Sequence, residues 1–186
     1  MRIVAGRFRG ATITAPKGTL TRPTSDRVRQ ALFNVLEHGA PAATFEGARV
    51  LDLFAGSGAL GLEALSRGAR YAVFIEESTE ARGAIRRNVE ALGLTGVTKI
   101  WRRDATKLGG VSNLAPFDLV FCDPPYGGKL GVRALASAIA GGWLAADAVA
   151  VLEERADATI AWPAPLTEIA VRRYGDTQIA IARMAG

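Results

Sequence analysis

One segment limits the possible folds of this sequence more than any other, and it covers residues 50–61, Val-Leu-Asp-Leu-Phe-Ala-Gly-Ser-Gly-Ala-Leu-Gly. Its apolar first half predicts a buried strand, and its glycine-rich second half predicts a tight turn that opens a helix. Glycine tolerates positive φ angles and lets the backbone approach a ligand, and the free N–H groups of a helix start point toward that ligand. The segment therefore predicts an α/β fold with a ligand site where this strand ends.

The rest of the chain repeats the alternation of strand and helix. Hydrophobic periodicity and turn signals predict strands over 49–54, 71–76, 97–102, 117–122 and 148–153, and helices over 59–67, 78–92 and 130–140. This alternation is typical of a mostly parallel sheet with helices on both faces. Two last apolar runs, 166–173 and 177–183, flank a Gly-Asp pair and predict a closing antiparallel hairpin.

The first 40 residues are expected to form an extension of this core. Two alternating runs separated by glycines predict a short β-hairpin over residues 2–15, and a helix capped at residue 24 or 25 should continue to about residue 37. A chain of 186 residues, 49% of them hydrophobic, suits one domain, with extension 1–40 and core 41–186. The only cysteine, Cys122, excludes a disulfide framework, and the lack of a signal peptide or long apolar run favours a cytoplasmic protein outside the membrane.

The most informative short motif is Asp123-Pro124-Pro125-Tyr126, which follows an apolar strand. The Asp123 carboxylate and the Pro124 carbonyl can each accept one hydrogen of an amino group, and proline offers no competing N–H. The Tyr126 ring can stack on the planar base that carries this amine. A proline-rich turn without function is the alternative, but the motif together with the glycine-rich segment indicates an amine-binding clamp beside a cofactor site.

Two cofactors fit the glycine-rich segment. Residues 56–61 match the G-x-G-x-x-G pattern of dinucleotide sites, and Glu76, which suits ribose hydroxyls, ends the next strand. A dehydrogenase is therefore one alternative, but the only histidine, His38, lies in another segment and offers no hydride-transfer partner. Asp52 lies near the end of the first predicted strand, four residues before the first glycine of the turn. A carboxylate at this position suits a cationic cofactor. We therefore favour S-adenosylmethionine, and the chemistry needs no metal.

Taken together, the motif Asp52-x-Phe54-x-Gly56-x-Gly58 and the clamp resemble motifs I and IV of class I amino-methyltransferases, and residues 1–10 and 22–34 resemble the RsmD family. The resemblance covers nearly the whole chain and implies a Rossmann-like fold. It also implies methyl transfer to the N2 amine of a guanine in small-subunit (16S) ribosomal RNA. Members of this family often have phenylalanine where this chain has Tyr126, and many have glutamate where it has Gln30, whose role stays open.

The resemblance and the strand-end rule together define the expected site. The clamp residues Asp123, Pro124, Pro125 and Tyr126 are expected to be catalytic. The cofactor is expected to contact Asp52, Phe54, Gly56, Ser57, Gly58, Glu76, Thr24 and Asp104, which would face the adenine amino group. The clamp alone would also accept an adenine N6 in DNA or a protein amide, and a nonenzymatic RNA-binding module is a third alternative.

Positive charge is concentrated at the N-terminus. Residues 1–36 hold seven basic side chains and one acidic side chain, a net charge of +6, whereas the whole chain carries +5. This asymmetry favours contacts with phosphate, and a solvated basic surface is the alternative. The expected RNA-binding residues are Arg7, Arg9, Lys17, Arg22, Arg29 and Lys129. The expected partner is small-subunit ribosomal RNA or an assembling 30S particle, bound by a monomer.

Overall fold

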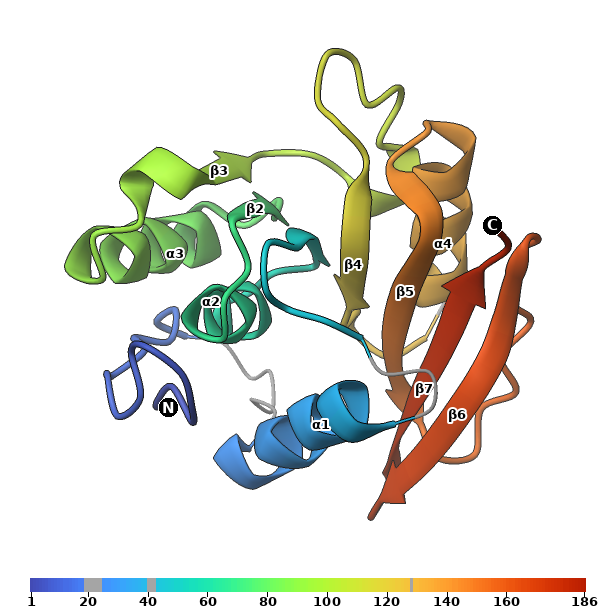
Figure 1. Cartoon of the computed structure of the whole chain (residues 1–186), viewed down its shortest axis with the longest axis horizontal. Coiled ribbons are helices and arrows are strands. Elements are labelled where there is room, and N and C mark those ends of the chain that lie inside the picture. The colour runs from blue at the N-terminus through green and yellow to red at the C-terminus, as the bar shows by residue number, and fades with distance from the viewer. Residues whose placement is uncertain (19–24, 40–42, 128) are drawn as a thin grey trace.

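Seven strands form one sheet in the computed structural model, which describes residues 1–18, 25–39, 43–127 and 129–186 (Figure 1). The strands are β1 (Arg49–Leu53), β2 (Tyr71–Ile75), β3 (Thr98–Trp101), β4 (Phe117–Cys122), β5 (Leu144–Arg155), β6 (Leu166–Tyr174) and β7 (Thr177–Met184). Their order is β3-β2-β1-β4-β5-β7-β6. The chain therefore turns from one side of β1 to the other between β3 and β4, which makes the β1–β4 boundary the switch point of the sheet.

The predicted mixture of parallel and antiparallel pairing is confirmed. Strands β1 to β5 pair in parallel, whereas β7 pairs antiparallel with both β5 and β6. The closing hairpin thus adds two strands beyond β5 at the edge of the sheet. The main difference from the predicted boundaries is β5, which begins four residues earlier and ends two residues later than the expected 148–153.

In the described part of the chain, four helices connect or flank these strands: α1 (Asp26–His38), α2 (Ala59–Ser66), α3 (Thr79–Ala91) and α4 (Leu130–Ala140). Side-chain caps explain two of their starts, because Ser25 accepts a hydrogen bond from the Val28 N–H at 3.2 Å and Ser78 accepts one from the Ala81 N–H at 3.2 Å. Two short 3₁₀ turns, η1 (Thr95–Val97) and η2 (Ala105–Lys107), were not predicted. No helix among the described residues has the length and apolar character needed to cross a membrane.

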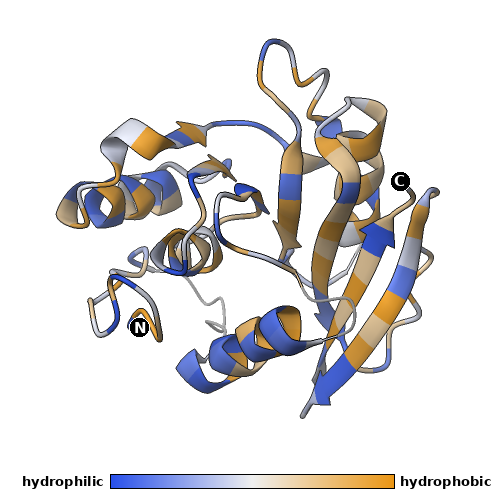
Figure 2. Cartoon of the chain, viewed as in Figure 1, coloured by the Kyte–Doolittle hydropathy of each residue, from blue (hydrophilic) through white to orange (hydrophobic). Residues whose placement is uncertain are grey.

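Helices cover both faces of the sheet and bury a hydrophobic cluster under each. On one face, α1, α2 and α3 pack on the strands, and the Phe33 and Phe121 ring centroids lie 5.5 Å apart. On the other face, α4 and buried Trp143 cover the strands, and Trp143 stacks on Phe117 with centroids 6.0 Å apart. Figure 2 shows the centre of the sheet mainly in apolar colours and the outer sides of α1 and α3 in polar colours. This packing holds the carboxyl ends of the strands in fixed relation.

The expected N-terminal hairpin is present in a minimal form. Arg2 and Thr12 form one isolated antiparallel bridge, with a hydrogen bond of 2.9 Å from the Ile3 N–H to the Ala11 carbonyl. Ile3 and Ile13 are only 1% and 2% exposed and belong to the same hydrophobic cluster as α1 and α2. The extension therefore shares its core with the sheet instead of projecting from it.

Candidate active site

The strand register brings the predicted site residues to one edge of the sheet. Leu53 lies opposite both Ile75 in β2 and Cys122 in β4. The residues that follow these three positions are Phe54, Glu76 and Asp123, so they lie side by side at the carboxyl ends of three adjacent strands. Asp52 lies two positions before Phe54, at the other side of the switch point from the clamp.

The turn after β1 has an unusual backbone. Phe54, Gly56 and Gly58 have φ angles of 55°, 58° and 81°, all in the left-handed region. Phenylalanine rarely adopts this conformation, and such strain is concentrated at ligand sites. A Cβ atom at Gly56 would meet nothing within 4 Å, whereas one at Gly58 would lie 3.2 Å from the Phe74 ring. Gly56 therefore faces open space, and Gly58 packs against the core.

Asp52 is a buried carboxyl group beneath this turn. Its side chain is 1% exposed, and its Oδ2 accepts a hydrogen bond of 3.0 Å from the Gly61 N–H in the first turn of α2. Burial raises the Asp52 pKa to about 8, because the loss of water outweighs the hydrogen bond from Gly61, and the nearby negative charge of Glu76 raises the pKa further. A buried acid in this state would be stabilised as a carboxylate by a positively charged ligand. The buried carboxyl group of Asp52 therefore fits a cofactor that carries a positive charge.

Glu76 is fixed over the same turn. Its Oε2 accepts from the Gly56 N–H at 2.9 Å, and its Oε1 accepts from the Ser78 N–H at 2.9 Å. Each carboxylate oxygen can accept a second hydrogen bond, so the group can still bind ribose hydroxyls. Of the two adjacent acids, Glu76 and Glu77, it is Glu76 that the structure directs to the glycine turn.

Asp104 lies at the next strand end, after β3. Its Oδ1 caps η2 by accepting from the Thr106 N–H at 2.9 Å and from the Thr106 hydroxyl at 2.7 Å. These hydrogen bonds lower the Asp104 pKa below its usual value, so the group is ionised near neutral pH. The contact with an adenine amino group stays a prediction. The short turn η2 is the element that holds this carboxylate.

The clamp extends from β4 toward solvent. Asp123 is half-buried and Pro124 is buried, whereas Pro125 is exposed and the Tyr126 side chain is 51% exposed. Cys122, just before the clamp, is buried, and its thiol pKa is raised by burial and by the negative charges of Asp123 and Asp52. These carboxylates therefore converge where β1 and β4 end. Cys122 therefore packs as a small apolar side chain in the core.

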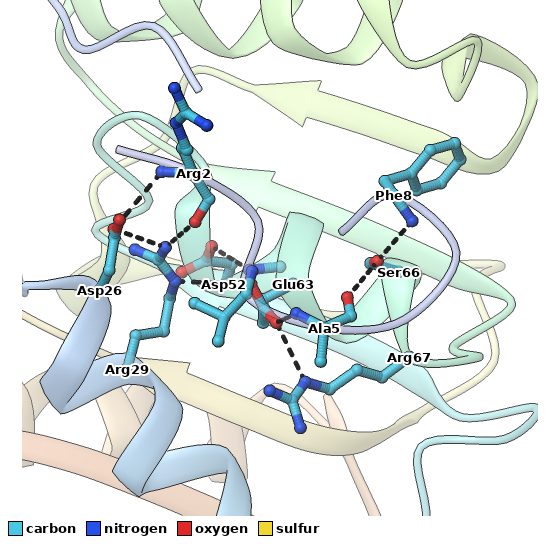
Figure 3. A network of polar contacts seen from close by, with 11 residues as sticks. Arg2, Ala5, Phe8, Asp26, Arg29, Asp52, Glu63, Ser66 and Arg67 are labelled. Carbon is cyan, nitrogen blue, oxygen red and sulfur yellow. Dashed lines mark hydrogen bonds and ion pairs between the residues drawn. The ribbon is translucent and has the colours of Figure 1, made fainter. Parts of the chain in front are cut away.

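Arg29 does not occupy the position expected of an RNA-binding residue. Its side chain is 0% exposed, contacts Asp26 at 2.9 Å and Glu63 at 3.5 Å, and donates a hydrogen bond to the Arg2 carbonyl (Figure 3). An arginine that is enclosed and paired in this way cannot reach a phosphate of a bound RNA. The prediction for Arg29 is therefore wrong. Its guanidinium group instead links α1 to the N-terminal segment through a hydrogen bond to the Arg2 carbonyl.

The partner of Arg29 is a residue that sequence analysis missed. Glu63 in α2 is 0% exposed, accepts from the Val4 and Ala5 N–H groups at 2.9 and 3.0 Å, and pairs with Arg67 at 3.0 Å. Figure 3 shows the two arginines reaching it from opposite sides. Glu63 thus joins the extension to the helix that starts at the glycine turn. It is the only charged residue in the mostly apolar helix α2, and a single charge among apolar residues is the sequence signal that could have identified it.

Comparison with known proteins places this arrangement in a family. The family described as Conserved hypothetical protein 95 matches residues 1–183. The chain belongs to this family. One relative is the Ribosomal RNA small subunit methyltransferase D of Escherichia coli strain K12. It is 36% identical over 157 residues, which cover 84% of this chain and 76% of the relative. This similarity confirms the resemblance to the RsmD family.

Further relatives agree with this family membership. The Putative rRNA methyltransferase YlbH of Bacillus subtilis is 38% identical over 128 residues, which cover 68% of this chain and 67% of the relative. The solved structure of the putative methyltransferase yhhF from Escherichia coli has a TM-score of 0.84 and 33% identity, and the match covers 100% of this chain and 98% of that one. The Rossmann-like methyltransferase fold is therefore confirmed for this family member.

The other charged residues predicted to bind RNA in this family member have different placements. Arg7, Arg9, Lys17 and Lys129 are exposed, so their side chains are available to phosphate. Arg22 and Thr24 lie outside the described residues.

Within the described part of the chain, no group of three or more histidine, cysteine, aspartate and glutamate side chains is arranged to hold a metal ion.

Proposed function

We propose that this protein transfers a methyl group from S-adenosylmethionine to the exocyclic N2 amine of a guanine in small-subunit ribosomal RNA. The observation that carries the proposal is the position of the Asp123 clamp, one strand away from the glycine turn at the switch point of the sheet. The names of the relatives from Escherichia coli and Bacillus subtilis support the class of substrate.

The cofactor fits the turn after β1 for three reasons. Gly56 leaves open space for it, Asp52 offers a buried carboxyl group for its positive charge, and Glu76 offers acceptors for its ribose hydroxyls. Phe54, Ser57, Gly58 and Asp104 complete the proposed contacts. When bound, S-adenosylmethionine supplies a methyl group attached to a positively charged sulfur.

The clamp activates the amine by accepting its hydrogens. The guanine N2 lone pair is delocalised into the ring, so the amine is a poor nucleophile. If the Asp123 carboxylate and the Pro124 carbonyl each accept one hydrogen, the nitrogen becomes pyramidal and its lone pair is exposed. Positive charge develops on this nitrogen only during transfer, so the negative charge of Asp123 stabilises the transition state more than the ground state.

The guanine reaches the clamp only when it is unpaired or flipped out of its helix. The half-exposed Tyr126 ring then offers a surface on which the base can stack. The exposed basic residues Arg7, Arg9, Lys17 and Lys129 are proposed to contact RNA phosphates. We infer that a monomer performs this reaction in the bacterial cytoplasm, on ribosomal RNA or an assembling 30S particle.

The proposal is tested by incubating the purified protein and labelled S-adenosylmethionine separately with 16S ribosomal RNA, 30S particles, DNA and protein. We expect label in N2-methylguanosine from one of the two ribosomal substrates. Label in N6-methyladenine of DNA or in a glutamine amide would replace this function with that of another amino-methyltransferase. Specific binding of NAD without S-adenosylmethionine binding would favour the dehydrogenase alternative.

A pair of alanine substitutions tests the cofactor turn. Gly56→Ala is expected to weaken S-adenosylmethionine binding at least about tenfold, because the new methyl group enters the open space at the turn. Gly93→Ala is the matched control, since Gly93 also has a positive φ, 68°, with nothing within 4 Å, but it follows α3 away from the site. Both variants should lose roughly 1–2 kcal/mol of stability to left-handed strain. Calorimetry should detect the affinity loss only in the first, and equal affinities would contradict the assigned turn.

A charge comparison tests the N-terminal RNA surface. The Arg7→Gln/Arg9→Gln variant should bind ribosomal RNA more weakly, and its log–log salt slope should fall by roughly one for each lost phosphate contact. The control, Arg70→Gln/Lys99→Gln, removes the same charge from exposed residues outside the N-terminal segment, beside the starts of β2 and β3. Salt titrations of RNA binding measure both slopes. If the two variants change the slope equally, the N-terminal charge is only a solvated surface.

A further inference from the structure

The Tyr126 side chain makes a contact outside the clamp motif. Its hydroxyl lies 3.0 Å from the Thr177 hydroxyl, in hydrogen-bond contact. Thr177 is the first residue of β7 and is 8% exposed, whereas Tyr126 is one of only two large hydrophobic side chains that are exposed among the described residues. The ring is therefore open to solvent while its hydroxyl is attached to a buried residue.

The residue that follows Tyr126 has no side chain with which to support the ring. Gly127 follows it with a φ of 99°, and a Cβ atom there would meet nothing within 4 Å. A side chain on such a segment samples several rotamers unless another contact selects one. The hydroxyl contact with Thr177 supplies that selection for the first side-chain torsion, χ1, because the oxygen lies on the Cβ–Cγ axis and its position therefore depends on χ1.

The anchor itself is rigid. Thr177 pairs with Arg155 at the end of β5 and with Tyr174 at the end of β6. The neighbouring Gln178 is 4% exposed and donates hydrogen bonds to the Arg155 and Ala158 carbonyls at 2.8 and 2.7 Å. The β6–β7 turn is thus tied to the segment after β5. A hydroxyl at Thr177 has a fixed position from which it can orient the exposed Tyr126 ring.

A positive charge lies beside the same turn. The Arg155 side chain is 59% exposed and is held by Asp157 through two hydrogen bonds of 3.0 and 3.1 Å. The Asp157 carboxylate neutralises this charge, and Asp176 adds an acid in the turn itself. The contribution of this end of the hairpin is therefore the position of the Tyr126 ring, and not a basic surface for phosphate.

We propose that Thr177 is a positioning residue, which holds the Tyr126 ring at the mouth of the clamp and makes the β6–β7 turn one wall of the pocket for the target purine. This inference rests on the proposed function, because the base is the ligand that the ring receives. Holding the ring before the base arrives removes part of the ordering cost of stacking. The hydroxyl of Tyr126 then contributes to RNA methylation, although the stacking itself needs only the ring.

A double-mutant cycle tests the proposal on the full chain with small-subunit ribosomal RNA or 30S particles as substrate. Thr177→Val keeps the shape of the side chain and removes the hydroxyl, and Tyr126→Phe removes the other partner. Each is expected to lower kcat/KM by about threefold to tenfold, which corresponds to the usual net value of one hydrogen bond. The double variant should be no worse than either single variant, and Thr177→Ser should restore wild-type activity because it keeps the oxygen.

Two controls separate positioning from folding. Thr167→Val makes the same change at an exposed site near the start of β6 and should leave kcat/KM unchanged. S-adenosylmethionine affinity should be equal in all variants. Additive losses in the double variant, or no rescue by serine, would overturn the role of Thr177. Failure of the wild-type protein to methylate either ribosomal substrate would instead reject the proposed function, so the two failures are distinguishable.

Discussion

Replacing Asp123 with asparagine is expected to lower the rate of methyl transfer by at least about 100-fold and to leave S-adenosylmethionine affinity within about twofold of wild type. Asparagine keeps the shape of the side chain, but it removes the negative charge that stabilises the developing positive charge on the guanine nitrogen. Because this charge develops only in the transition state, the loss should fall on kcat more than on the KM for RNA. Single-turnover methylation assays and calorimetry measure the two quantities.

Asp118 provides the control for this substitution. It lies on the same strand as the clamp, near the amino end of β4, and its exposed carboxylate accepts from the Arg49 N–H at 2.8 Å. Asp118→Asn removes the same charge and keeps an oxygen for that bond, so transfer should stay near the wild-type rate. Equal losses in the two variants would mean that charge at Asp123 acts only through general electrostatics. Unchanged transfer in Asp123→Asn would remove Asp123 from the mechanism.

The strands and their terminal acids were predictable because they depend on local pattern. The expected strand over 117–122 matches β4 (Phe117–Cys122), and the expected helix over 130–140 matches α4 (Leu130–Ala140). Once these strands are arranged in parallel, the positions of Glu76 and Asp123 follow, since each comes directly after a strand. The local sequence pattern therefore carries enough information to place these predicted site residues side by side.

The contacts between distant segments were not predictable in the same way. A count of basic residues treats Arg29 as exposed, but its burial depends on Glu63, which becomes a neighbour only when α1 packs beside α2. Similarly, the partner of the Tyr126 hydroxyl depends on how the β6–β7 hairpin docks against β5. Local periodicity contains neither relation. The left-handed φ of Phe54 is also invisible from its residue type, which disfavours that conformation.

The second large effect is expected from Asp52→Asn, which should stabilise the cofactor-free protein at alkaline pH. The folded-state pKa of about 8 lies above the ordinary value of 3.8, so between these pH values the native state holds a proton that the unfolded chain has released. The stability contributed by this proton is fully present below the ordinary pKa and is lost as the pH rises toward 8. Asparagine does not titrate and can still accept from the Gly61 N–H.

Urea unfolding at several pH values measures this effect. Relative to wild type, the unfolding free energy of Asp52→Asn should rise by roughly 2–5 kcal/mol between pH 5 and pH 9, because only the wild type must bury a carboxylate at the higher pH. Asp118→Asn, which changes an exposed carboxyl group, should show no such gain. A constant difference between Asp52→Asn and wild type across this range would contradict the raised pKa.

The same substitution should weaken cofactor binding, and the loss should grow with pH. A cationic cofactor favours the ionised form of Asp52, so its binding to wild type releases a proton below about pH 8. The ratio of wild-type to variant affinity should therefore increase from pH 6 to pH 8 and then level off, at a loss of at least about tenfold. Taking this ratio cancels the titration of the cofactor itself. Calorimetry in buffers of different ionisation enthalpy counts the released proton, and an affinity ratio that stays constant over this range would mean that Asp52 does not sense the positive charge of the cofactor.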